Sequence, residues 1–195
     1  LSIQKDKSKA LIVYVYDEIE REATGEAGHW WLHESLKKLE NSFKKEFKLD
    51  LIVMEGSAQE SLSKLIKKYK INRVVWNRLY SKKSISRDTK IKQDLKEKNI
   101  EVETFNAHLL NEPWEVQNNS GLYFKVFTPY WRKAFDVYKA KKYQITSLKS
   151  IDPLEHNEKT QWNFLPSKKW YQKFSNYWKP GEEAALEKLK YYINN

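Results

Sequence analysis

ALIVYVYD (residues 10–17) is an unbroken run of apolar, largely β-branched and aromatic residues that ends on an aspartate. Such a run predicts a strand buried on both faces, because a strand with one solvated face would alternate apolar and polar side chains. Three similar runs follow: LDLIVMEG (49–56), INRVVWNR (71–78) and IEVETFN (100–106). The four runs predict four strands of a mainly parallel sheet.

Amphipathic helical patterns separate these strands. The first has apolar residues at steps of four, three and four, which form one helix face: Leu32, Leu36, Leu39 and Phe43. The next starts with a capping-box pattern, Ser57 and Glu60, and the third is a lysine-rich helix over 84–98. Strands that alternate with such helices indicate βαβ units, so we predict the α/β class: an open, mostly parallel Rossmann-like sheet with flanking helices.

The chain divides into three regions by composition. Residues 1–9 are polar and are expected to be loose, and residues 10–110 carry the α/β pattern. Residues 111–195 form a long irregular connection, with one short helix expected over 129–138 and a polar linker after it. Pro180 and Gly181 then open a final helix, which we expect to be the first helix of a further domain.

Composition limits the classes of function. The 195 residues contain no cysteine, which excludes disulfides and thiolate metal sites. No apolar run is long enough to cross a bilayer and no signal peptide is visible, so we expect a cytoplasmic protein with no membrane partner. The formal net charge of +10 favours anionic partners such as nucleic acid, although lysines supply most of it.

Common catalytic and metal motifs are absent from the sequence. It contains no GxGxxG, no P-loop and no GxSxG pattern. His29 and His33 are four residues apart and could share a zinc ion, but no third ligand is apparent, and we expect them to be helix-surface histidines. Three glutamates lie in the polar connection after the first predicted strand, and we expect them to form part of a solvated loop: Glu18, Glu20 and Glu22. No catalytic residue is assigned.

WNRLYSKKSISRD (76–88) is the candidate binding site. It starts at the carboxyl end of a predicted strand, where open α/β sheets bind their ligands. Within thirteen residues it supplies an amide, two guanidinium groups, a phenol and a carboxylate, which suit a small-molecule pocket with polar anchors. The five candidate side chains are Asn77, Arg78, Tyr80, Arg87 and Asp88.

Five motifs together resemble the N-terminal α/β (antenna) domain of the DNA photolyase/cryptochrome family, of the class I deoxyribodipyrimidine photolyase type. GHWWLHESLKKLENSF (28–43) is similar to the family's "WWLHxSL" helix, and WNRLY followed by RD is similar to its fourth strand and loop. The remaining three lie in the same order as in the family: FNAHLLNEPW, LYFKVFTPYWRKAF and FLPSKKW…YWKPGEEAALEKL.

The resemblance implies a function for the domain. In the family, the α/β domain carries or borders an antenna chromophore, and a larger helical domain binds FAD and damaged DNA for light-driven repair of cyclobutane pyrimidine dimers. We therefore expect this chain to hold a reduced folate, a deazaflavin or a flavin at Asn77, Arg78, Tyr80, Arg87 and Asp88. FAD is expected only in the helical domain, which this sequence lacks, so the chain alone is expected to be inactive.

The family's opening strand is also missing from the sequence. In the family's strand order, 3-2-1-4-5, that strand is central, so the strands at 10–16 and 73–76 are expected to lose their shared neighbour. Three outcomes are open: the two strands close the gap, the isolated chain is only marginally stable, or the remainder of a split photolyase completes the sheet. We expect marginal stability. Three other readings stay open: a cryptochrome-like photoreceptor domain, a nucleotide-binding module of the same superfamily, and a non-functional gene remnant.

The adjacent tryptophans Trp30 and Trp31 stand at the head of the first helical pattern. We predict that at least one of the two rings packs inward, because burying a large side chain contributes roughly 1.5–3 kcal/mol.

Overall fold

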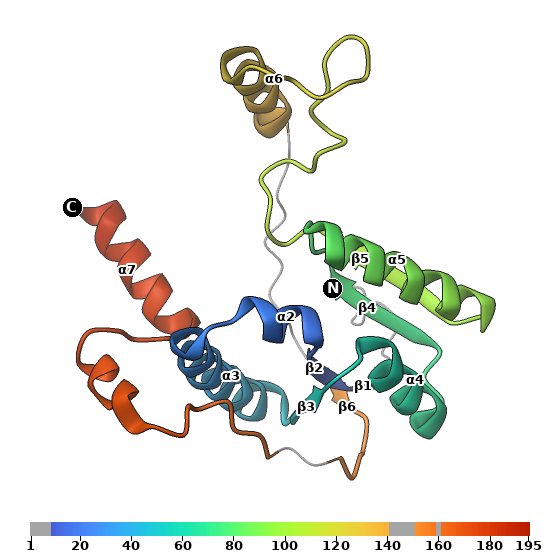
Figure 1. The fold of residues 1–195 in the computed structure, drawn as a ribbon, viewed down its shortest axis with the longest axis vertical. Helices are drawn as coiled ribbons and strands as arrows, with labels where there is room; N and C mark the ends of the chain where they lie inside the picture. Colours follow the sequence, from blue (N-terminus) through green and yellow to red (C-terminus); the bar gives the residue numbers. More distant parts are fainter. Residues whose placement is uncertain (1–8, 141–150, 159–160) are drawn as a thin grey trace. The chain divides into compact units, whose positions relative to one another are not determined.

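A computed structural model describes residues 9–140, 151–158 and 161–195 (Figure 1). The described residues form two compact units, one of residues 9–64, 151–158 and 161–195 and the other of residues 65–140. Helix α4 (Ala58–Tyr69) begins in the first unit and ends in the second. The predicted division at residue 110 stays a prediction.

The first unit is built on parallel strand pairs. Strand β2 (Ile12–Tyr16) pairs with β3 (Leu51–Glu55), and the two-residue strands β1 (Lys9–Ala10) and β6 (Asp152–Pro153) pair with each other. In β3, Leu51 and Ile52 are fully buried.

The prediction that this strand is buried on both faces is wrong for most of β2, because its residues before Tyr16 are only half-buried. Alternate residues of β2 belong to the core cluster or pack against it: Ile12, Tyr14 and Tyr16. Because alternate residues of a strand point to the same face, only one face of β2 is well packed.

Helix α3 (Glu26–Phe47) and a returning C-terminal segment complete the core of the first unit. Leu36 of α3 is buried against Tyr16, Leu51 and Phe164. Lys48 caps the end of the helix in the left-handed conformation (φ 56°), and its backbone N–H donates to the carbonyl of Lys44 in the last turn. The 3₁₀ helix η1 (Lys169–Asn176) and helix α7 (Glu182–Asn194) follow, and α7 contacts α3.

The polar connection after β2 is a helix rather than a loop. Helix α2 (Glu18–Ala23) starts from Asp17, whose buried carboxylate accepts the backbone N–H of Glu20 at 3.0 Å. Glutamates in the first helical turn also favour the positive end of the helix dipole. The solvated loop expected around Glu18, Glu20 and Glu22 is therefore wrong: this aspartate cap was the overlooked signal.

The second unit holds the other parallel pair, β4 (Arg73–Asn77) with β5 (Glu101–Phe105). Helix α5 (Lys82–Glu97) contacts β5, and its Ile91 and Leu95 are buried as predicted. Helix α6 (Phe127–Ala140) follows a long irregular stretch. The pairs β2–β3 and β4–β5 are those that the predicted strand order requires, and parallel strands with flanking helices confirm the α/β class.

The two adjacent tryptophans have different environments. Trp30 is 5% exposed and meets Phe174 of η1 edge to face, with ring centroids 5.1 Å apart. Trp31 is 43% exposed and touches the ring of Trp178 at 6.3 Å. The prediction of one inward ring is confirmed, and that ring joins α3 to the C-terminal segment of the first unit.

His33 is buried, and the expectation that it lies on a helix surface is wrong. It is 3% exposed, its ring meets Trp162 edge to face, and its Nδ1 accepts the backbone N–H of Phe164 at 3.4 Å. Its Nε2 has no hydrogen-bond partner among the described residues. Burial, with a smaller contribution from Lys37, lowers the pKa of His33, so the folded protein favours the neutral ring.

We expect Trp30→Ala to destabilise the protein by about 3–5 kcal/mol, because it leaves a cavity between α3 and η1. The matched change Trp31→Ala should cost less, about 1 kcal/mol, since Trp31 is 43% exposed and leaves a smaller cavity. Urea unfolding followed by circular dichroism measures both. Equal losses in the two variants would contradict the packing described for this pair.

We expect acid to weaken the first unit through His33. A histidine whose pKa is lowered by folding stabilises the fold fully above its unfolded pKa of about 6.5, and this contribution is lost as the pH falls below that value. The melting temperature should therefore fall more steeply between pH 7 and pH 5 in the wild type than in His33→Gln. His108→Gln, at an exposed histidine, is the control and should keep the wild-type slope.

Candidate functional site

The candidate residues lie where β4 ends and α5 begins, in the second unit (Figure 1). The backbone N–H of Arg78 donates to the carbonyl of Phe105 at 2.8 Å, which extends the β4–β5 ladder by one residue. Ser81 then caps α5 by accepting the N–H of Ser84 at 3.1 Å. The loop from Asn77 to Ser81 is thus held at both ends at the carboxyl edge of this strand pair.

Arg78 is fixed by a buried carboxylate, Glu112. Its Nε and one terminal nitrogen donate to the two Glu112 oxygens at 2.7 and 2.9 Å. Its other terminal nitrogen donates to the carbonyl and hydroxyl oxygens of Thr104 on β5, at 2.6 and 2.9 Å. Hydrogen bonding to Glu112 raises the pKa of Arg78, so the guanidinium stays charged. This fork geometry is specific to arginine, and lysine could not reproduce it.

Tyr80 and Trp114 complete this group, here called the Arg78 clasp: Arg78, Tyr80, Glu112 and Trp114. The Tyr80 hydroxyl donates to Glu112 Oε1 at 2.6 Å. Burial and this hydrogen bond raise the pKa of Tyr80, so the phenol is neutral. The Arg78 guanidinium carbon lies 5.7 Å from the centre of the Trp114 ring, which is 55% exposed.

Glu112 is the residue that sequence reasoning missed. It lies 34 residues after Arg78, in NEPWE, and is 8% exposed. Its backbone N–H donates to Glu115 Oε2 at 2.5 Å, so the turn that carries it is fixed locally. The available signal was the acidic, tryptophan-containing turn after the fourth strand, but sequence spacing gives no reason to pair it with Arg78.

The remaining candidates have other roles. Arg87 Nε donates to the neighbouring Asp88 Oδ1 at 2.8 Å, so these two side chains pair with each other on α5. Asn77 is exposed at the end of β4. The structure therefore brings Arg78 and Tyr80 together around Glu112 and joins Arg87 to Asp88.

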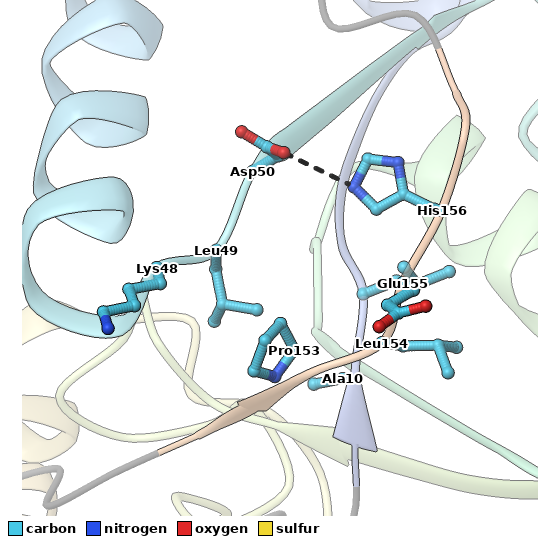
Figure 2. Close-up of a pocket in the computed structure, with 9 residues that line it drawn as sticks. Ala10, Lys48, Leu49, Asp50, Pro153, Leu154, Glu155 and His156 are labelled. Atoms are coloured by element: carbon cyan, nitrogen blue, oxygen red, sulfur yellow. Dashed lines mark ion pairs between the residues drawn. The ribbon is translucent and has the colours of Figure 1, made fainter.

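A cavity lies in the first unit, and its lining includes none of the candidate residues (Figure 2). Its volume is about 190 Å³, and it is found at the amino ends of β2 and β3, with Ala10, Leu49, Asp50, Pro153, Leu154 and His156 among its lining residues. His156 Nε2 is 3.9 Å from Asp50 Oδ2, too far for a hydrogen bond. The cavity is smaller than the roughly 300–1,000 Å³ typical of ligand pockets, which argues against a flavin or folate there.

The histidine pair forms no metal site in the described part of the chain. His29 Nε2 lies 2.5 Å from the Tyr16 hydroxyl, so this ring nitrogen is engaged in a hydrogen bond with the phenol, whose pKa is raised mainly by burial. His33 is engaged by the backbone of Phe164. Among the described residues, no three histidine, aspartate or glutamate side chains are grouped closely enough to hold a metal ion.

Comparison with known proteins gives consistent matches. The family model described as DNA photolyase matches residues 3–150. A deoxyribodipyrimidine photo-lyase of Agrobacterium fabrum is 36% identical over 174 residues, covering 87% of this chain and 36% of that protein. Cryptochrome-2 of Arabidopsis thaliana is 33% identical over 113 residues, covering 58% of this chain and 18% of that protein. The chain thus spans about a third or less of the length of these relatives.

A solved structure shows the same fold. A crystal structure described as a bacterial class III photolyase from Agrobacterium tumefaciens superposes with a TM-score of 0.82 and 31% identity, covering 96% of this chain and 39% of that one. The class I type expected from the sequence is not confirmed, because this structure is described as class III. None of the described helices is long and apolar enough to cross a membrane.

We expect Glu112→Gln to destabilise the second unit by about 1–3 kcal/mol, because Arg78 would lose its charged partner in a largely buried setting. Asp136→Asn, at an exposed carboxylate, is the control and should change stability by no more than about 0.5 kcal/mol. Thermal unfolding at neutral pH measures both, and a Glu112→Gln melt that matches the control would mean that the clasp does not support the fold.

Proposed function

The chain belongs to the DNA photolyase family, and from that premise we propose that it is the antenna-chromophore domain of a deoxyribodipyrimidine photolyase. In this role it holds a light-absorbing pigment that passes excitation energy to FAD. The observation that carries the proposal is the match of the α/β fold to a photolyase over 96% of the chain. Repair of cyclobutane pyrimidine dimers is proposed for the whole photolyase and not for this chain by itself.

The proposed pigment site is the loop between β4 and α5. It comprises Asn77, Arg78, Tyr80, Arg87 and Asp88, with a reduced folate, a deazaflavin or a flavin as ligand. The Arg78 clasp supports this proposal in one respect: it fixes the loop and leaves the Trp114 ring more than half exposed beside it. Energy transfer needs a well-positioned pigment ring and no covalent chemistry by the protein. An aromatic surface on which that ring can stack suits this role.

We further propose that exposed apolar faces dock the flavin-binding helical part of a photolyase. Helix α6 presents a stripe of stacked rings, with Phe127 against Trp131 at 6.2 Å and Trp131 against Phe135 at 5.5 Å. Each of these rings is at least 39% exposed. In the first unit, α7 exposes Leu186, Leu189 and Tyr192. Apolar faces of this kind mark interaction surfaces. Damaged DNA and FAD would be bound by that partner.

A cryptochrome-like photoreceptor domain is the second candidate, because Cryptochrome-2 matches over 58% of the chain. A photoreceptor would share this domain and its pigment but would not repair DNA. The comparisons do not support the two other hypotheses, a nucleotide-binding module and a non-functional gene remnant.

Pigment binding tests the proposed site. We expect purified chain to bind at least one of a reduced folate, a deazaflavin and a flavin saturably, with quenching or a spectral shift at tens of micromolar pigment. Tyr80→Ala should weaken this binding, whereas Tyr138→Ala, at an exposed tyrosine of α6, should not. Absence of binding by all three pigments would sink the antenna proposal.

Reconstitution separates photolyase from photoreceptor. We expect blue-light dimer repair when this chain is co-expressed with a photolyase helical segment that binds FAD, and none from either piece alone. Leu186→Lys on α7 should reduce the recovered repair, because it places a charge on the proposed docking face. Pigment binding without repair in any combination would favour the photoreceptor.

A further inference from the structure

The second unit carries the excess positive charge of the described residues. Residues 65–140 contain sixteen lysines and arginines but only eight aspartates and glutamates. The described residues of the first unit contain fourteen basic and seventeen acidic side chains. The excess of basic residues is therefore not an even background of the composition. Charge of one sign gathered in one unit attracts an anionic partner and speeds its association.

Lysines supply this excess at the surface of the second unit. Three of the four arginines in residues 65–140 form ion pairs with carboxylates: Arg73, Arg78 and Arg87. Eleven of the twelve lysines in the same range are exposed. An exposed lysine is a hydrated point charge on a flexible stem, which suits contact with successive phosphates along a backbone and carries no sequence information.

Helix α5 arranges part of this charge in a row, here called the α5 lysine row: Lys82, Lys90 and Lys96. The helix buries Ile91 and Leu95 on one face, and its 3.6-residue period places the three lysines on the opposite face, where all three are exposed. At a rise of 1.5 Å per residue the row is about 21 Å long. The phosphates of a DNA strand repeat every 3.4 Å along the duplex axis, so the row has the length of about six base pairs.

Acidic residues of α5 reduce its positive charge without cancelling it. The helix contains six basic and three acidic side chains, a formal excess of three positive charges. Asp88 pairs with Arg87 at 2.6 Å. Glu97 lies on the same face as the lysine row, and its Oε1 accepts a hydrogen bond from Gln93 Nε2 at 3.2 Å. The helix therefore remains attractive to a polyanion with all of its own carboxylates counted.

The composition of α5 distinguishes between classes of polyanion. The helix contains no aromatic residue, whereas proteins that bind single-stranded nucleic acid supply rings on which the bases stack. A helix that lies on a membrane surface needs a broad apolar face. In α5, Ile91 and Leu95 are buried, and Ile85 is the exposed apolar residue, at 49%. These features favour the regular phosphate backbone of a duplex over a single strand or a lipid surface.

We propose that the α5 lysine row binds the phosphate backbone of double-stranded DNA without reading its sequence or a lesion. This contact goes beyond the proposed function, in which the flavin-binding partner binds the DNA, and it needs neither pigment nor FAD. The three lysines are not among the pigment candidates, so the two sites can be tested separately. Such a contact would hold the chain on undamaged DNA as well as at a lesion.

Fluorescence anisotropy of a labelled, undamaged DNA duplex of about 20 base pairs tests the proposal with the full chain. We expect binding at about 50 mM salt that weakens as salt is added, with a slope of about −3 in log K against log salt, because three lysines displace counterions. Lys90→Glu combined with Lys96→Glu should weaken binding roughly tenfold or more and reduce the slope by about 2.

The matched control is Lys188→Glu combined with Lys190→Glu, at exposed positions of α7 in the first unit. It changes the net charge by the same amount and should weaken binding by no more than about twofold. Equal weakening by the two double variants would mean that general charge, and not α5, binds the duplex. The milder pair Lys90→Gln and Lys96→Gln should give an intermediate loss, and circular dichroism checks that each variant keeps its helices.

The remaining arms test the kind of partner. A duplex that carries a cyclobutane dimer should bind as tightly as the undamaged one, and a preference for the lesion overturns a contact with the backbone alone. Tighter binding of single-stranded DNA of the same length, or of phosphatidylserine vesicles, overturns the assignment to a duplex, as does absence of duplex binding at about 50 mM salt. Pigment binding should be unchanged in the Lys90→Glu, Lys96→Glu variant, so failure of this inference leaves the antenna proposal standing.

Discussion

Val74 faces Val102, and Trp76 faces Thr104, across the parallel pair β4 and β5. Parallel pairing is the constraint on which the other features of the second unit depend. Two parallel strands need a crossover connection, which α5 provides, and their carboxyl ends meet at one edge. That edge is where the chain places Arg78 after one strand and the turn bearing Glu112 after the other. The site therefore follows from strand direction, not from any local motif.

The Arg78–Glu112 pair illustrates how a buried charge is tolerated. A partly buried guanidinium needs both a counter-charge and partners for its nitrogens. Glu112 supplies a bidentate carboxylate, and Thr104 supplies two oxygens. Thr104 belongs to β5. The Arg78 side chain therefore both closes the loop onto Glu112 and ties the loop to the strand pair. The hydrogen bonds of Arg78 thus tie the loop to Glu112 and to β5, and the exposed Trp114 ring lies beside the Arg78 guanidinium.

The first unit uses aromatic rings and one buried imidazole for a similar purpose. Trp30 meets Phe174, and His33 meets Trp162 while accepting the N–H of Phe164. These contacts join α3 to residues more than 120 positions later in the chain. They also account for two motif residues, Trp30 and His33, through packing, so neither needs a role as a ligand.

The sequence by itself determined the strands, the long helices and their alternation, because continuous apolar runs and four-three spacings are local signals. Ile91 and Leu95 of α5, and Leu36 of α3, could all be assigned to the core in this way. The family could be recognised because its motifs keep their order. Local signals failed where a partner is distant: the depth of His33, the partial exposure of β2 and the pairing of Arg78 with Glu112 all depend on residues brought together by folding. Only the tertiary structure decided these, since burial and ion pairing are properties of surroundings that spacing along a chain does not encode.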